Sequence, residues 1–172
     1  MINVEQNSDK KLQEVIRELL DTDKDIRGYA LEADVVNGEV TLQGVVDTLA
    51  EKVRLEEKLR QIPGVRRIEN NITISTDGEI TDADVLKEVR EELNADPEVN
   101  LRDIGAQVSR GTVILRGHTD NPAQVQRAAK TAAKARGVHR VLNQVHIDRH
   151  DDADLSLEHI FHSQVRNDDD GP

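Results

Sequence analysis

The chain has 172 residues, enough for one ordinary domain or two small ones, with a formal net charge of −11 and a hydrophobic content of 36%. It contains one Phe, one Tyr and no Trp, so any core must be aliphatic, and the aromatic platforms that bind single-stranded nucleic acid are excluded. The absence of Cys excludes disulfides, thiolate nucleophiles and cysteine-type zinc sites.

The first 20 residues lack the basic segment followed by an apolar segment that marks an export signal. No apolar run approaches the roughly 18 residues that a membrane-spanning helix needs. We therefore expect a soluble protein without a membrane span, located in the cytoplasm, or in the periplasm if residue 1 marks a processed start.

An internal repeat with a period of about 73 residues runs from the first predicted helix to the last predicted strand. About eighteen of about 66 aligned positions are identical, and most others exchange one aliphatic residue for another. The clearest match pairs NGEVTLQG at Asn37–Gly44 with RGTVILRG at Arg110–Gly117. The sequence therefore predicts two copies of one folding unit.

The first copy is predicted to begin with an amphipathic helix that has Ser8 or Asp9 as its N-cap. The apolar residues that recur at helical spacing are Leu12, Val15, Ile16, Leu19 and Leu20. A strand follows, in which alternate residues are expected to face the core: Leu31, Ala33 and Val35. Asn37-Gly38 predicts a two-residue hairpin turn, because both residues tolerate a left-handed backbone.

The returning strand buries Val40 and Leu42 in this prediction and ends at Gly44. The two glycines of this stretch are separated by a strand, so they indicate a turn and a strand end and not a phosphate-binding loop. A second helix is predicted to start at Asp47, with four residues facing the sheet: Leu49, Val53, Leu59 and Ile62. The last strand covers residues 65–74.

The second copy repeats this order, with Thr81 as the predicted N-cap of its first helix and Arg110-Gly111 as its hairpin turn. Its second helix is predicted to open at Asn121-Pro122, since Pro suits the first helical position. Each copy therefore reads α-β-β-α-β, an α+β unit with a three-stranded mixed sheet and two helices on one face. We expect an N-terminal lead (1–9), a first domain (10–76), a linker (77–80), a second domain (81–148) and an acidic tail with a short amphipathic helix (149–172).

The stretches Gly38–Gly44, Glu51-Lys52 and Pro63–Ile74 resemble the BON domain (bacterial osmotic-shock and nodulation). The second copy keeps Gly111–Gly117, Gly137-Val138 and Asn143, but has Gln124-Val125 and Arg136 where the first copy has Glu51-Lys52 and Pro63. The resemblance covers residues 10–148 and implies a tandem, non-enzymatic bacterial protein. It further implies binding to anionic phospholipid, a link to osmotic stress or, in one branch of the family, potassium binding.

Charge is distributed unevenly along the chain. Residues 104–147 carry seven cations against the single acid Asp120, whereas residues 1–103 and the tail from residue 148 are acidic. Arg127, Lys130 and Lys134 are spaced so that they share one helix face. We expect this second copy to contact an anionic partner through a basic face with six members: Arg116, Arg127, Lys130, Lys134, Arg136 and Arg140. The alternative is a solvated face that is neutralised within the protein.

The tail contains apolar residues at helical spacing, which we expect to pack on a repeat or in a partner's groove: Leu157, Ile160, Phe161 and Val165. A metal site can be drawn from His146, Asp148 and His150, but exposed histidines of this kind usually bind nothing, and we expect no metal and no cofactor.

These features favour a non-catalytic binding and assembly module whose partner is a phospholipid, an envelope polymer or another subunit. A homo-oligomer could form between the acidic first domain and the basic second domain, or through the tail. The alternative function is an osmotic-stress sensor for a small ligand or potassium. No nucleophile, base and orienting group stand together, so we expect no enzyme, and the acidic remainder of the chain argues against nucleic acid.

Overall fold

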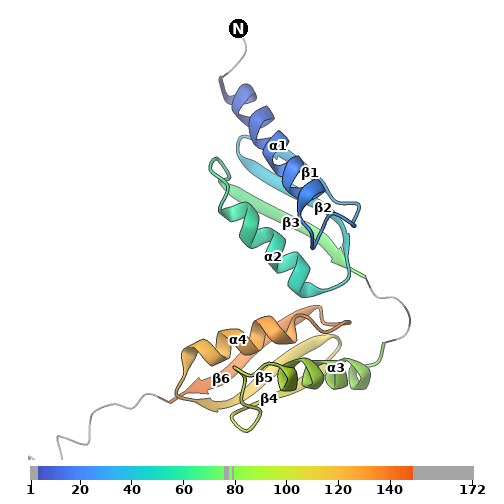
Figure 1. Ribbon diagram of the computed structural model, residues 1–172, viewed down its shortest axis with the longest axis vertical. Helices are drawn as coiled ribbons and strands as arrows, with labels where there is room; N and C mark the ends of the chain where they lie inside the picture. Colours follow the sequence, from blue (N-terminus) through green and yellow to red (C-terminus); the bar gives the residue numbers. More distant parts are fainter. Residues whose placement is uncertain (1–3, 76–77, 79, 149–172) are drawn as a thin grey trace, which may run out of the picture.

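The computed structural model describes residues 4–75, 78 and 80–148, which form two successive units (Figure 1). The first unit consists of α1 (Val4–Thr22), β1 (Glu32–Val36), β2 (Glu39–Val46), α2 (Leu49–Arg60) and β3 (Arg67–Ile74). The second consists of α3 (Asp82–Ala95), β4 (Ile104–Ser109), β5 (Thr112–Thr119), α4 (Pro122–Ala132) and β6 (Arg140–Ile147). The predicted order α-β-β-α-β is confirmed in both copies.

Each unit contains a three-stranded sheet whose central strand is the second in sequence. The first two strands pair antiparallel, and the second and third pair parallel. A parallel pair needs a crossover connection, which the second helix of each unit provides. The predicted α+β class with mixed sheets is therefore confirmed.

Both helices of a unit cover the same face of its sheet (Figure 1). In β2, Val40 and Leu42 are fully buried under the helices, whereas Gln43 is exposed on the other side. In β5, Leu115 and Arg116 alternate in the same way. We call the side without helices the open sheet face.

Each unit has its own aliphatic core. The first consists mainly of Leu12, Ile16, Leu20, Ile26, Val35, Val40, Leu42, Val46, Leu55, Leu59 and Ile72. The second is built mainly from Val85, Val89, Leu93, Val99, Ile104, Val113, Leu115, Val125, Ala128, Ala132, Ala135 and Val138. The protein therefore has two small cores, one in each unit.

The prediction that Val53 of α2 faces the sheet was wrong. Val53 is 41% exposed, and Leu55 is fully buried. Residues two positions apart point roughly 200° apart on a helix, so Leu55 and Leu59 face the sheet while Val53 faces away. Leu49 also departs from the prediction, because it packs against the core of the second unit.

Both hairpin turns have the predicted left-handed conformation. The φ angles are 53° and 77° at Asn37 and Gly38, and 49° and 71° at Arg110 and Gly111. Two successive positive φ values are typical of the type I′ turn, which matches the right-handed twist of the strands.

Asp9 does not cap α1, which begins five residues earlier at Val4. Its carboxylate instead accepts hydrogen bonds from the backbone N–H groups of Asn37 (2.7 Å) and Gly38 (3.0 Å). Asp82, 73 residues later, accepts the two equivalent bonds at 2.8 and 3.0 Å. An Asp on the first helix therefore anchors the hairpin turn in each unit.

The other predicted helix starts agree with the structure. Thr81 caps α3 in a reciprocal arrangement with Asp84, and Asn121 caps α4 with Pro122 in the first turn. The N-cap of α2 is Thr48, one residue after the predicted start.

Candidate anion-binding site

The structure divides the six cations of the predicted basic face between separate places. Arg116 and Arg140 lie on the open sheet face of the second unit, where the Arg116 guanidinium donates to the Gln144 side chain at 3.0 Å. Arg136 contacts Glu88 of α3 through both its backbone N–H (3.0 Å) and its guanidinium (3.1 Å). The other three, Arg127, Lys130 and Lys134, lie on α4 or just beyond its end.

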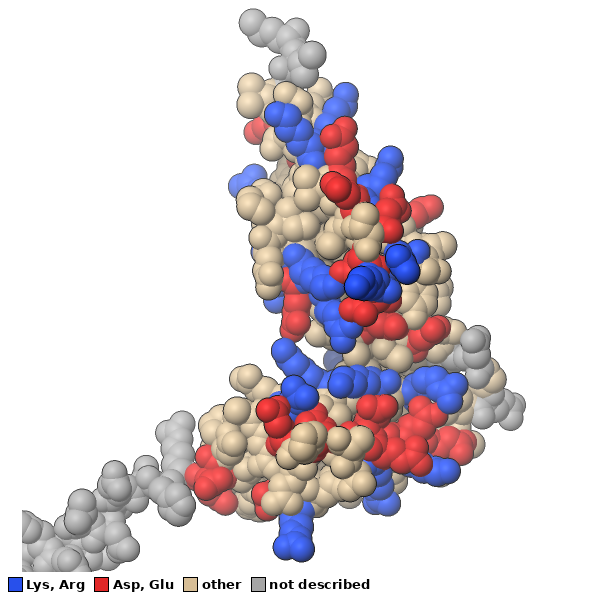
Figure 2. Space-filling view, viewed as in Figure 1, with Lys and Arg blue, Asp and Glu red and all other residues tan. Residues whose placement is uncertain are grey.

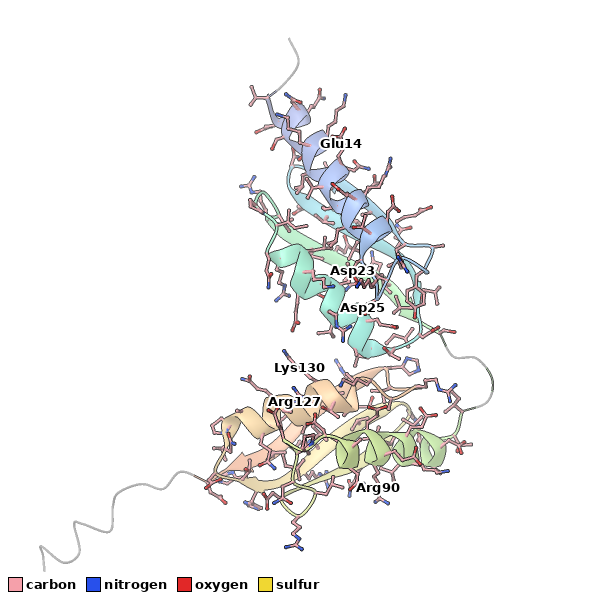
Figure 3. All side chains as sticks on the ribbon, in the orientation of Figure 1. Glu14, Asp23, Asp25, Arg90, Arg127 and Lys130 are labelled. Carbon is pink, nitrogen blue, oxygen red and sulfur yellow. The ribbon has the colours of Figure 1, made fainter. Side chains whose placement is uncertain are left out.

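Arg127, Lys130 and Lys134 line the junction between the two units. Figure 3 labels Arg127 and Lys130, which extend from α4. Here the N–H of Ala50, at the start of α2, donates to the Ala133 carbonyl at the end of α4, at 3.0 Å. The Lys130 ammonium is 3.9 Å from the Glu57 carboxylate of α2. In the space-filling view, Lys and Arg side chains gather along this junction (Figure 2).

A groove of about 300 Å³ opens between α2 and α4. Four cations line it, Arg54, Arg127, Lys130 and Lys134, against the single carboxylate of Glu57. The sequence prediction missed Arg54, although the repeat contained a signal, because Arg54 is the residue that aligns with Arg127.

The two arginines of the groove are held by acids of their own units. Arg54 pairs with Asp25 at 2.7 Å, and Arg127 pairs with Asp96 at 2.7 Å and Glu98 at 3.3 Å. The Arg54–Asp25 and Arg127–Glu98 pairs occupy equivalent positions in the repeat, and each fixes the loop after the first helix of its unit to the second helix. Both arginines therefore have a structural role whether or not a ligand binds.

Asp96 is the acid that the structure buries most firmly at this place, with a side chain 4% exposed. Hydrogen bonds from the Thr131 hydroxyl (2.5 Å) and the Arg127 guanidinium lower the pKa of Asp96 to about 2. The hydrogen bond to Asp96 and the negative charges of Asp96 and Glu98 raise the pKa of Arg127 above its ordinary value. The pair is therefore fully ionised at neutral pH.

The two lysines are less engaged than the arginines. The side chains of the Lys130–Glu57 pair are 67% and 52% exposed, and exposed pairs of this kind contribute about 0–1 kcal/mol. Lys134 is exposed and forms no ion pair or side-chain hydrogen bond with any residue that the structure describes. Both lysines are thus available to an anion that enters the groove.

The residues that carry the family resemblance have structural roles. Glu51 completes the cap of α2 and accepts a bond from the Tyr29 hydroxyl at 3.0 Å, and Lys52 donates to the Ile72 carbonyl at 2.8 Å. Burial and the neighbouring carboxylates of Asp47 and Glu51 raise the pKa of Tyr29, which keeps this phenol protonated. The motif residues therefore stabilise the folded unit.

The histidines that suggested a metal site lie partly within the described residues. His118 and His146 stack edge to face at 5.4 Å, and His118 is 3.5 Å from Asp148. His150 and the predicted partner stripe, Leu157, Ile160, Phe161 and Val165, lie outside the described residues. Over residues 4–75, 78 and 80–148, no three metal-ligating side chains come together.

In the part of the chain that the structure describes, no helix combines the length and the apolar character needed to cross a bilayer.

Comparisons with known proteins agree with the repeat. A family model described as the BON domain matches residues 8–76 and again residues 81–149. The search of the curated proteins found no match.

Among solved structures, similarity is found to CdsD of Chlamydia trachomatis, described as a structural protein of the Type III secretion system. This match has 14% identity and a TM-score of 0.35, and covers 94% of this chain and 70% of the other. A second match, to the C-terminal domain of CdsD, has 15% identity and a TM-score of 0.35, with coverages of 82% and 67%. Scores this low say nothing about function. The two family matches, by contrast, span most of the sequence, and the chain belongs to the BON domain family as a tandem pair of copies.

Proposed function

We propose that the protein is a non-catalytic binding and assembly module that holds a phosphate-bearing anionic partner in the groove between its two units. The observation that carries this proposal is the convergence of Arg54, Arg127, Lys130 and Lys134 on one groove with a single carboxylate. Membership of the BON family, which is associated with anionic phospholipids, supports the same class of partner.

The arrangement favours an anion that is recognised by charge. Asp25 and Asp96 hold the two arginines in place, so the walls of the groove are positioned before a ligand arrives. Lys130 and Lys134 then contribute mobile point charges, which suit a phosphate group without demanding one geometry. A phosphate entering the groove would compete with Glu57 for Lys130.

Vesicle flotation tests this function. The full chain is mixed with vesicles of phosphatidylcholine alone or with added phosphatidylglycerol, at low salt and at about 1 M salt, where screening is nearly complete. We expect binding that requires the anionic lipid and is lost at high salt. Each basic residue near such a surface contributes about 1 kcal/mol, so Lys130→Glu with Lys134→Glu should weaken binding at least about 30-fold.

Lys10→Glu with Lys11→Glu is the control, because it makes the same double charge reversal at two exposed lysines of α1 outside the groove. Calorimetry with inorganic phosphate separates the two sources of the anion. Binding of phosphate as well as vesicles identifies the phosphate group as the ligand, and binding of vesicles alone identifies a lipid surface. If neither binds, or if the reversal at Lys130 and Lys134 weakens binding no more than the reversal at Lys10 and Lys11 does, the proposal is overturned.

A further inference from the structure

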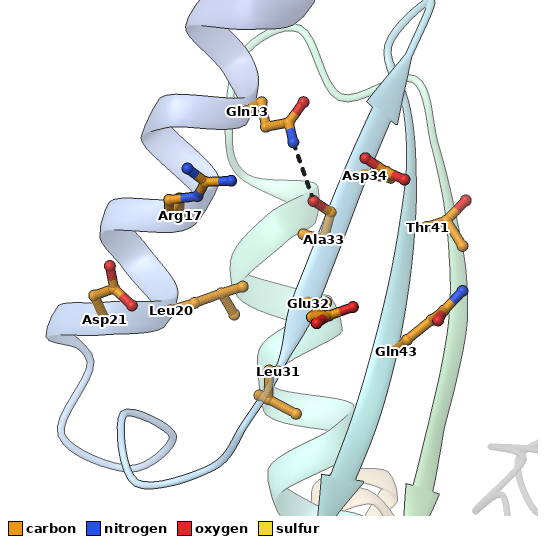
Figure 4. A pocket seen from close by; sticks show the side chains of 10 residues that line it. All are labelled: Gln13, Arg17, Leu20, Asp21, Leu31, Glu32, Ala33, Asp34, Thr41 and Gln43. Atoms are coloured by element: carbon orange, nitrogen blue, oxygen red, sulfur yellow. Dashed lines mark hydrogen bonds between the residues drawn. The ribbon is translucent and has the colours of Figure 1, made fainter.

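A groove runs between the first helix and the first strand of each unit, along the outer edge of the sheet. In the first unit this groove has a volume of about 370 Å³ and polar walls that include Arg17, Glu32 and Asp34 (Figure 4). The Gln13 side-chain amide donates to the Ala33 carbonyl at 3.4 Å and so covers part of the β1 edge (Figure 4).

The equivalent groove of the second unit, between α3 and β4, is larger and more apolar. Its volume is about 640 Å³, and Leu86, Leu101, Ile104 and Ala106 line it. Leu101 is 41% exposed there. Water is therefore in contact with an apolar surface beside an edge strand.

Three exchanges between the repeats produce this difference. Leu86 replaces Gln13, Leu101 replaces Gly28, and Gly105 replaces the Glu at position 32. Leu86 has no donor with which to cover the edge of β4, so the contact that Gln13 makes in the first unit is missing. Exposed strand edges and apolar patches are ordinarily covered in a stable protein, and this groove has both features.

We propose that the chain's own C-terminal segment, residues 157–165, occupies the groove between α3 and β4. Its apolar residues, Leu157, Ile160, Phe161 and Val165, follow the spacing of one helix face. An amphipathic helix that lays such a face into an apolar groove is a recurrent binding mode. The chain's single Phe lies in this segment.

The path of the chain permits this contact within one molecule. At the end of β6, the N–H of Asp148 donates to the carbonyl of Thr119 in β5, at 2.9 Å. On the other side of β5, β4 begins at Ile104, which pairs with Gly117. Two strand spacings separate the end of β6 from the groove, about 10 Å. The eight residues 149–156 can span about 26–29 Å when extended.

Charge also favours this partner. Lys87 and Arg90 lie at the rim of the groove. Glu91, which is 4.0 Å from Lys87, is the acid at this rim. The connecting residues 149–156 carry three acids, Asp151, Asp152 and Asp154, and one arginine. A net negative connector thus approaches a rim with more cations than acids.

Paramagnetic relaxation measures the contact directly. Because the chain has no Cys, Ser163→Cys accepts a single nitroxide on the polar side of the stripe. In the ¹⁵N-labelled full chain we expect strong broadening of the amides of residues 101–106, and none at Glu32 or Ala33 in the polar groove of the first unit. Phe161→Asp should remove the broadening without touching the folded units.

Leu86→Gln should also remove it, because this change gives the second groove the residue that the first unit already accommodates at that position. A mixture of spin-labelled ¹⁴N chain with unlabelled ¹⁵N chain shows whether the contact is within one molecule. No selective broadening at residues 101–106, broadening that survives Phe161→Asp, or equal broadening in the mixture would each overturn the proposal.

Discussion

The Thr131 hydroxyl donates to the Asp96 carboxylate at 2.5 Å, and the Arg127 guanidinium reaches the same carboxylate at 2.7 Å. At the equivalent place in the first unit, the Lys58 ammonium bonds to Asp23. The two copies thus keep an acid in the loop after the first helix and exchange its partner on the second helix. In each copy this acid joins the loop after the first helix to the second helix, which are far apart in sequence. Protonation of the acid should therefore lower the stability of the unit.

We predict that Asp96 makes the second unit sensitive to acid. The pKa of Asp96 is about 2 in the folded protein against 3.8 for the ordinary group, so the folded state favours the ionised form. Its contribution to stability is present above a pH of about 4 and is lost as the pH falls towards about 2. Urea unfolding across this range should show that Asp96→Asn lowers the free energy of unfolding at pH 7 and flattens its dependence on pH. Asp21→Asn, at an exposed carboxylate, is the control; equal pH profiles for Asp96→Asn and the native chain would contradict the prediction.

Because each unit has its own core, we predict that the two units can be destabilised separately. Leu42 and Leu115 occupy equivalent positions of β2 and β5, and both are fully buried. Replacing either with Ala should cost about 2–5 kcal/mol. Because the two side chains belong to different cores, Leu42→Ala should speed amide hydrogen exchange in the first unit, and Leu115→Ala in the second. Faster exchange throughout the chain in either variant would show instead that the two units unfold together.

A methyl group at Gly117 should be far more disruptive than one at Gly28. Gly117 has a φ of 143°, and a Cβ atom built on it would lie 1.8 Å from the Asp103 carbonyl oxygen. The backbone conformation alone costs a non-glycine residue about 1–3 kcal/mol, and the clash adds to this. A Cβ atom at Gly28 would meet nothing within 4 Å. Thermal unfolding of Gly117→Ala and Gly28→Ala compares the two, and equal midpoints would show that the junction of β4 and β5 can move aside.

The sequence was sufficient to predict the units because their construction is local. Alternation around Val40 and Leu42 specifies strand and face together, and Asn37-Gly38 specifies the hairpin turn between neighbours in sequence. Asp9 was misassigned because its partners are 28 and 29 residues away, at the turn. Hydrophobic periodicity and capping preferences describe neighbours in sequence, so they cannot predict a contact between residues this far apart.

The groove at the junction was predicted only in part, for a related reason. The spacing of Arg127 and Lys130 placed them on one helix face, which is a property of α4 alone. That Arg54 joins them, and that Glu57 faces Lys130, depends on how one unit meets the other. The two units carry the same pattern, so the pattern cannot specify which surfaces of the two copies come together.

The last prediction concerns that junction and uses the repeat as its guide. Leu49 is the first residue of α2 and packs against the core of the second unit, whereas the aligned first residue of α4 is Pro122. Leu49→Pro therefore removes the apolar contact but keeps the helix start, since Pro suits this position and Thr48 before it is already extended, with φ −133° and ψ 155°. We expect the first unit to keep its stability. The rotational correlation times from ¹⁵N relaxation should become shorter for both units, because each then tumbles more independently of the other. Arg60→Ala, a change at an exposed residue of the same helix that does not line the groove between the units, should leave the tumbling as it is. Unaltered relaxation in Leu49→Pro would mean that the Ala50–Ala133 hydrogen bond and the Lys130–Glu57 pair are enough to hold the units together.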